Sequence, residues 1–251
     1  VLALEPEPFT MLESTEDALE WFHDLYADPG ALSAAERALR RDNLAGLSPA
    51  EALRRHVGVC FDVCHQAVIW EDAAASIRSL LQAGIRIGKV QVSNAVERPP
   101  DVDPAVALAP YAEPRYLHQV FAEPRAGESR PPRCLDLPTA LAEGTWYRDR
   151  AWRCHFHVPI FRADLAGGLR TTQPELLAVL RELAWQTVRH GSPPPLLEIE
   201  TYTWHVLPSS VTAALAAEPG RAIAEELSWL ARTWSDTIGV AESKLRAQDV
   251  P

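Results

Sequence analysis

The stretch Val57-Gly58-Val59-Cys60-Phe61-Asp62-Val63-Cys64-His65 decides the fold class. Its first part is almost continuously apolar and ends on an aspartate, which is typical of a strand buried on both faces of a parallel sheet. A helical pattern precedes it at about residues 48–56, and an alanine-rich helix is expected after it at about 70–83, with Gly84 at its end. This order of helix, strand and helix indicates an α/β protein.

Further strands and helices follow the same alternation along the chain. Such an order of near-continuously apolar strands favours a parallel sheet that is covered by helices. No glycine-rich phosphate loop follows a strand, which argues against a nucleotide-binding open sheet. The further strands are expected at residues 1–5, 85–93, 152–160 and 196–201, and the further helices after Thr15 as N-cap, at 173–190 and at about 221–234.

We therefore expect an α/β fold of the (β/α)8 TIM-barrel type. About five strands are counted where a closed barrel needs eight, so residues 1–251 are expected to hold only the C-terminal five or so β/α units of a single barrel domain. The stretch at about 98–144 is rich in proline, alanine, arginine and glutamate, and is expected to be an irregular insertion over one barrel face. Unpaired sheet edges and an uncovered core face then predict that the isolated chain aggregates or needs the missing N-terminal part of the barrel.

The composition favours a globular protein that acts on small molecules. The chain has 251 residues, of which 24 are basic and 34 are acidic, giving a formal charge of −10. This charge opposes binding to nucleic acid and to anionic membrane surfaces. Because no apolar run reaches the roughly 20 residues that cross a bilayer, we expect a cytoplasmic protein without membrane insertion. Both a monomer and an oligomer are compatible with the sequence. The four cysteines are irregularly spaced and are expected to be reduced and mostly buried.

Polar residues gather where the expected strands end. In a TIM barrel the carboxyl ends of the strands carry the active site. The period of two in a strand places the members of each of these groups on one face. The residues concerned are Glu5, Cys60 with Asp62, Lys89 with Gln91 and Ser93, His155 with His157, and Glu198 with Glu200.

Several carboxylates at one edge repel one another unless a cation neutralises them. The sequence therefore predicts a divalent metal ion. Oxygen ligands with an amide suit Mg, Mn or Co, whereas additional histidines favour Zn or Fe. For His155 and His157 the alternative is that the rings only bond to backbone carbonyls, and Glu198 is expected to support the site rather than to bind the ion.

The strand-end segments resemble the metal-site segments of the xylose-isomerase-like superfamily, which holds sugar isomerases, epimerases and the endonuclease IV group. Within it, the chain looks closest to the EboE-type proteins, which are named for a proposed part in metabolite traffic. The Asp-x-x-His of Asp62 and His65 is the most specific element. The segments that carry the resemblance are Leu4-Glu5-Pro6-Glu7-Pro8, Cys60-Phe61-Asp62-Val63-Cys64-His65, Lys89-Val90-Gln91-Val92-Ser93, Tyr116-Leu117-His118-Gln119, His155-Phe156-His157-Val158-Pro159 and Glu198-Ile199-Glu200-Thr201-Tyr202-Thr203-Trp204.

The resemblance implies roles for individual residues. Glu5 and Glu200 would bind the metal and also serve as acid and base, and His65 would contact metal or substrate. Gln91 stands where the epimerases usually have histidine, and His155 stands in the acidic position of an Asp-x-His pair. The implied metal ligands are thus Glu5, Asp62, His65, Gln91, His157 and Glu200, and the expected substrate-binding residues are Lys89, His155 and Trp204, with Tyr202 beside the last.

Three functions fit these expectations. The first is a metal-dependent isomerase or epimerase that acts on a small polyhydroxylated or phosphorylated metabolite. The second is an EboE-type metabolite traffic or binding protein with little or no catalysis, which the departure at Gln91 favours. The third, cleavage of damaged DNA, is weakened by the net negative charge.

Overall fold

Four strands form a parallel sheet in the computed structural model, which describes residues 1–44, 46–212 and 219–248. Asp62 lies in register with Gln91, and Gln91 with Glu198, so these side chains share one face of the sheet. The expected α/β class with a parallel sheet is confirmed. The order across the sheet is β1 (Leu2–Leu4), β2 (Val57–Asp62), β3 (Arg86–Val92) and β9 (Leu196–Ile199).

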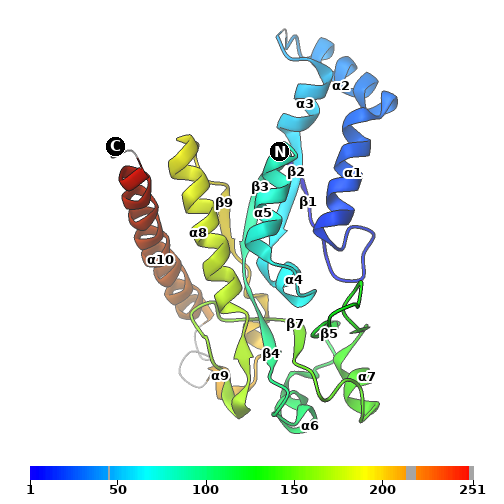
Figure 1. Cartoon of the computed structure of the whole chain (residues 1–251), viewed down its shortest axis with the longest axis vertical. Coiled ribbons are helices and arrows are strands. Elements are labelled where there is room, and N and C mark those ends of the chain that lie inside the picture. Colours follow the sequence, from blue (N-terminus) through cyan, green and yellow to red (C-terminus); the bar gives the residue numbers. More distant parts are fainter. Residues whose placement is uncertain (45, 213–218, 249–251) are drawn as a thin grey trace.

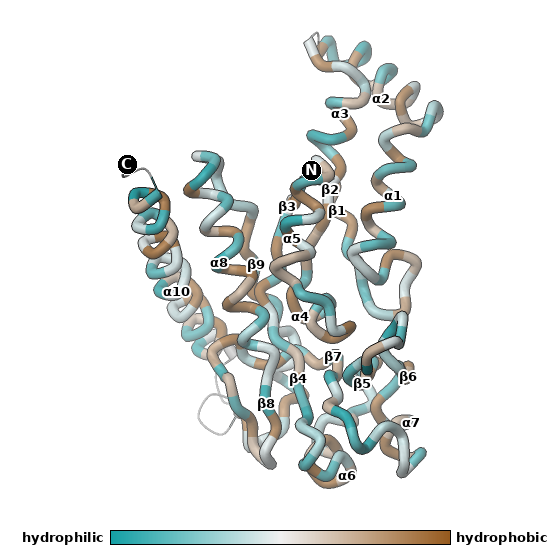
Figure 2. Tube along the Cα trace, viewed as in Figure 1, coloured by the Kyte–Doolittle hydropathy of each residue, from teal (hydrophilic) through white to brown (hydrophobic). Residues whose placement is uncertain are grey.

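Helices cover the other face of the parallel sheet (Figure 1). Hydrophobic and hydrophilic residues alternate along these helices in Figure 2, as expected for helices with one buried side. Their apolar side chains form one core with the strands, in which Phe22, Phe61, Ile77, Val90 and Leu180 are fully or almost fully buried. The helices are α1 (Thr15–Ala27), α5 (Ala73–Gln82), α8 (Gln173–His190) and α10 (Pro219–Gln248).

The helix ends follow local capping chemistry. The bounds of α8 agree with the expected 173–190, whereas α10 is longer than the expected 221–234. The N-cap of α1 is Ser14 and not Thr15: the Ser14 hydroxyl accepts a hydrogen bond from Asp17 N at 3.1 Å, and the Asp17 carboxylate accepts one from Ser14 N at 2.9 Å. This reciprocal capping box satisfies two amide groups at the helix start.

A second, antiparallel sheet lies at the carboxyl end of the parallel one (Figure 1). Ser93 is the one residue between β3 and β4, so a single run of chain passes from the first sheet into the second. Arg153 on β7 joins the second sheet to the segment that follows β2. Its guanidinium donates to Ala67 O at 2.9 Å and lies over the Trp70 ring. The order across the second sheet is β6 (Arg133–Cys134), β5 (Val120–Ala122), β7 (Trp152–Val158), β4 (Asn94–Arg98) and β8 (Arg170–Thr171).

The expectation that the strand at 152–160 joins the parallel sheet is wrong. This strand, β7, pairs antiparallel with β4 and β5. All seven of its residues are buried. A strand that is buried on both faces has the same kind of sequence in a parallel and in an antiparallel sheet, so the sequence does not indicate its direction. The stretch expected to be irregular at 98–144 supplies β5 and β6 of this sheet, together with short helices.

The remaining elements are helices that connect the strands and helices named above, and most of them are short. None of the helices in the described ranges combines the length and the apolar character needed to cross a membrane. The four cysteines are free, and Cys60, Cys64 and Cys154 are buried, as expected. The other elements are α2 (Pro29–Arg41), α3 (Pro49–His56), α4 (Val63–Val68), α6 (Pro104–Ala107), η1 (Ala109–Tyr111), α7 (Leu137–Ala142), η2 (Ala166–Gly168), η3 (Tyr202–His205) and α9 (Ser209–Thr212).

Candidate metal centre

Asp62 lies where β2 ends and α4 begins, and its side chain is completely buried. Oδ1 accepts hydrogen bonds from Ser93 Oγ at 2.7 Å and from His65 N at 3.1 Å. Oδ2 has no hydrogen-bond partner among the described residues. Leaving a buried carboxylate oxygen without a partner is costly, so Oδ2 is oriented for a further group.

Two histidine rings face this free oxygen. Nε2 of His65 and Nε2 of His157 each lie 3.7 Å from Asp62 Oδ2. In each ring the other nitrogen is occupied: His65 Nδ1 donates to Pro6 O at 2.9 Å, and His157 Nδ1 donates to Glu200 O at 2.5 Å. These bonds place the proton on Nδ1 and leave the lone pair of Nε2 directed at Asp62, which is how metal-binding histidines are oriented.

The three donor atoms fit a divalent metal ion. Asp62 Oδ2, His65 Nε2 and His157 Nε2 belong to a buried group whose ligand atoms all lie within 4.8 Å of one another. Neighbouring donors around a tetrahedral ion with bonds of about 2.1 Å are about 3.4 Å apart, close to the separations found here. His157 Nε2 is buried and has no hydrogen-bond partner in the described part of the chain. The cluster can therefore hold a metal, and two histidines with one carboxylate suit Zn, Fe, Mn or Co.

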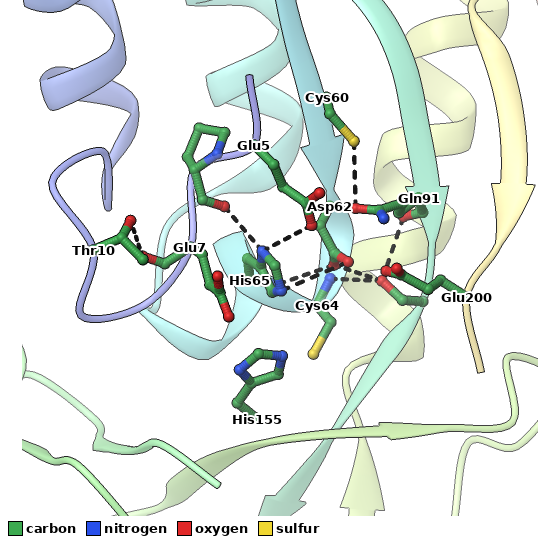
Figure 3. Close-up of polar contacts among 12 residues, drawn as sticks. Glu5, Glu7, Thr10, Cys60, Asp62, Cys64, His65, Gln91, His155 and Glu200 are labelled. Carbon is green, nitrogen blue, oxygen red and sulfur yellow. Dashed lines mark hydrogen bonds and ion pairs between the residues drawn. The ribbon is translucent and has the colours of Figure 1, made fainter. Parts of the chain in front are cut away.

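Two further carboxylates border the site on its solvent side. Glu5 follows β1 and Glu200 follows β9, and both form a second close group with Asp62 (Figure 3). Their side chains are 36% and 31% exposed, whereas Asp62 is buried. An ion at Asp62 would therefore be reached from solvent past Glu5 and Glu200.

The three carboxyl groups of Glu5, Asp62 and Glu200 differ in their pKa values. Burial and the negative charge of Asp62 raise the pKa of Glu200 to about 9. Burial also raises the pKa of Glu5. Although burial opposes its ionisation, the pKa of Asp62 stays below its usual range, because the His65 and His157 rings attract the carboxylate whenever they are protonated and the Ser93 hydroxyl donates to it. The metal-free site at neutral pH thus carries a proton where a cation would sit.

This protonation predicts that metal affinity rises with pH. Below about pH 9 the metal-free protein keeps a proton on Glu200, which lies beside Asp62, and the charge of an ion bound at Asp62 must displace that proton. One released proton corresponds to an affinity gain of about tenfold per pH unit between about pH 6.5 and 8.5. Titration with Co²⁺ against a competing chelator at several pH values measures this slope. Glu200→Gln should flatten it, and a pH-independent affinity of the unaltered protein would contradict the assignment.

His155 lies next to the three-residue cluster. Its ring is 4.6 Å from that of His65 and 5.3 Å from that of His157, and its Nδ1 is bound to Gln119 Oε1 at 2.8 Å. Burial lowers the pKa of His155 and of His157, so both rings are neutral and able to bind a cation. Two overlapping groups contain His155, one with Glu7 and His65 and one with Cys64 and His157.

The sequence did not assign Glu7 and Cys64 to the site. Burial raises the pKa of the Cys64 thiol well above its usual value, so Cys64 is a poor thiolate ligand without an ion beside it. Glu7 is the stronger addition, since it follows the Glu5 segment directly. Its signal in the sequence is the period of two, which puts Glu5 and Glu7 on one side of an extended chain.

Gln91 and Lys89 lie on the site face of β3. Gln91 is buried beside Asp62, and its Oε1 accepts a hydrogen bond from the Cys60 thiol at 3.4 Å. Lys89 forms an ion pair with Glu198 on the neighbouring strand, and this contact raises the pKa of Lys89. Both residues thus already have partners: Gln91 contacts Cys60, and Lys89 pairs with Glu198.

Trp204 does not line the site. Only 8% of it is exposed, and it packs in the hydrophobic core beside the antiparallel sheet. Its Nε1 donates to Glu226 Oε2 at 3.0 Å. The aromatic side chain next to the cluster is Tyr202, whose ring is 4.7 Å from that of His157 and 5.0 Å from that of Tyr116. Of the two aromatic residues expected at the site, Tyr202 therefore lies beside the cluster and Trp204 does not, and Tyr116 contacts Tyr202.

Comparison of the chain with protein-family models, with curated proteins and with solved structures gives no match. The geometry around Asp62 is consequently the observation on which a functional argument can rest.

Proposed function

We propose that the chain binds a divalent metal ion through Asp62, His65 and His157, and acts as a metal-dependent isomerase or epimerase on a small polyhydroxylated metabolite. One observation carries the proposal. Asp62 Oδ2 and His157 Nε2 are buried 3.7 Å apart, and neither has a hydrogen-bond partner in the ranges that the structure describes. Two such acceptors side by side are unfavourable in a folded protein unless a proton or a metal cation lies between them.

The chemistry follows from what surrounds the cluster. A bound divalent ion would polarise the carbonyl and hydroxyl oxygens of a substrate. Glu5 and Glu200 approach from the ends of β1 and β9 and are the candidates for moving a proton at the carbon beside that carbonyl. Glu200 without its proton accepts one from carbon, and Glu5 returns one on the other side. Tyr202 offers an aromatic face on which the substrate can pack.

We also propose that the parallel sheet is part of a (β/α)8 barrel with the site at its mouth. The four strands run parallel with helices on one face, and the polar face leads to the site. At the β9 edge of that face Leu196 is 64% exposed. A neighbouring strand and a covered interior would bury such a residue.

Metal content and proton exchange test the enzymatic proposal together. The purified protein is loaded with Mn²⁺, Co²⁺ or Zn²⁺ and incubated in D₂O with aldoses, ketoses and their phosphates, and deuterium uptake at carbon is followed by NMR. We expect near-stoichiometric metal, and deuterium at the carbon beside the carbonyl of at least one substrate. Glu200→Gln should stop the uptake. A metal-free protein after loading would refute the proposed centre.

The alternative is a metabolite traffic or binding protein that uses the same metal centre with little catalysis. The observation that favours it is Gln91, whose oxygen contacts the Cys60 thiol and whose amide is a weaker ligand than histidine. In that case the metal is retained and a metabolite binds, but no deuterium enters any carbon position. The exchange experiment therefore separates the two functions.

A further inference from the structure

Glu226 on α10 is a buried carboxylate with three uncharged donors and lies outside the metal cluster. Its exposed fraction is 0%. Oε1 accepts from Thr201 Oγ1 at 2.6 Å and from Ile160 N at 3.1 Å, and Oε2 accepts from Trp204 Nε1 at 3.0 Å. Such a group is expensive to bury, so its position calls for a reason beyond packing.

The three donors belong to the two chain segments that carry His157 and Glu200. Ile160 follows β7 shortly after His157, and Thr201 is the residue after Glu200. The same segments are bound to each other, because His157 Nδ1 donates to Glu200 O and the Thr203 hydroxyl donates to His157 O. Glu226 thus connects to both sides of the hydrogen bond that orients the His157 ring.

We propose that Glu226 is a positioning residue of the metal centre, holding the ends of β7 and β9 so that His157 keeps its proton on Nδ1 and directs Nε2 at Asp62. The consequence for metal affinity rests on the proposed function. The consequence for the His157 ring does not, because it is a property of the metal-free protein.

A carboxylate is needed at this position, and an amide cannot replace it. Ile160 N–H and Trp204 Nε1–H are fixed donors that point at different oxygens of Glu226. A glutamine offers one acceptor oxygen and one NH₂ group, so one of the two fixed donors would face another donor. The Thr201 hydroxyl can rotate and does not relieve that conflict.

The test compares Glu226→Gln with Glu225→Gln, a neighbouring exposed position on α10 that loses the same charge. In long-range ¹H–¹⁵N spectra of the metal-free proteins, we expect His157 to be the Nδ1–H tautomer in the unaltered chain and in Glu225→Gln. In Glu226→Gln we expect a tautomer mixture with fast exchange of the ring proton. Co²⁺ affinity should fall about tenfold in Glu226→Gln alone, with a changed visible spectrum of the bound Co²⁺.

The outcomes are separable. An unchanged His157 tautomer in Glu226→Gln, with Co²⁺ affinity within about twofold of Glu225→Gln, overturns the positioning role. If the unaltered protein binds no Co²⁺ but the tautomer still changes, the positioning role stands and the proposed metal function fails. If Glu226→Gln does not fold, Thr201→Val removes one link and should shift the tautomer and the affinity in the same direction, whereas Thr201→Ser keeps the hydroxyl and should restore both. No difference between these two variants would also overturn the proposal.

Discussion

Substitution of Asp62 by asparagine is expected to abolish metal binding and leave the fold intact. The asparagine oxygen can keep the bonds that Oδ1 accepts from Ser93 and from His65 N. Its NH₂ group then takes the place of Oδ2 and can donate hydrogen bonds to the Nε2 atoms of His65 and His157. The site then has no anionic ligand for a metal ion. Metal content after loading should fall from near-stoichiometric to below about a tenth.

A matched control is Asp72→Asn. Asp72 caps the start of α5 as Asp62 caps the start of α4, but it lies outside the cluster. Its asparagine variant should keep full metal content by mass spectrometry. In the metal-free state, Asp62→Asn should unfold within about 2 °C of the unaltered protein or above it, because a buried charge has been removed. Full metal content in Asp62→Asn would refute the centre, and unfolding of that variant at room temperature would show that Asp62 is structural.

Metal loading is expected to raise the free energy of unfolding by about 4 kcal/mol when free metal exceeds its dissociation constant about 1,000-fold. The ligands come from both sheets: Asp62 and His65 lie at the end of β2 and in α4, and His157 lies in β7. Unfolding of either sheet therefore releases the ion, and the whole binding energy adds to the stability of both. Urea unfolding with Zn²⁺ or with EDTA measures the difference.

Asp62→Asn is the reference for that measurement, and Zn²⁺ should leave its unfolding midpoint unchanged. Equal midpoints for the unaltered protein with metal and with EDTA would contradict a centre that spans the two sheets. A gain that persists in Asp62→Asn would indicate metal binding elsewhere on the surface.

The parts of the site that the sequence predicted depend on short distances along the chain. Asp62 and His65 are three residues apart at a strand end, so one capping turn brings them together. Glu5 and Glu200 follow parallel strands whose carboxyl ends meet at the same edge. Helix α8 was predicted with its bounds because its amphipathic pattern is long and Gly191 ends it in a left-handed conformation.

The rest depended on contacts that a pattern along the chain does not encode. A buried strand has the same apolar pattern in either direction, so the pairing of β7 with β4 and β5 was not predictable. Trp204 faces the core, where its indole N–H donates a hydrogen bond to Glu226 on a helix that is distant in the sequence. Tyr116 and Gln119 belong to one of the segments that carry the family resemblance. Their contacts with Tyr202 and His155, however, form only when the second sheet folds.

The pairing of β4 with β7 separates the cluster residues from part of the side chains around them. Arg98, at the end of β4, lies in register with Trp152, at the start of β7. The stretch 99–151 therefore leaves and rejoins the scaffold at two neighbouring points, while Asp62, His65 and His157 lie outside it. Substitutions within this stretch therefore change the side chains that contact Tyr202 and His155, namely Tyr116 and Gln119, and leave the three donor residues in place.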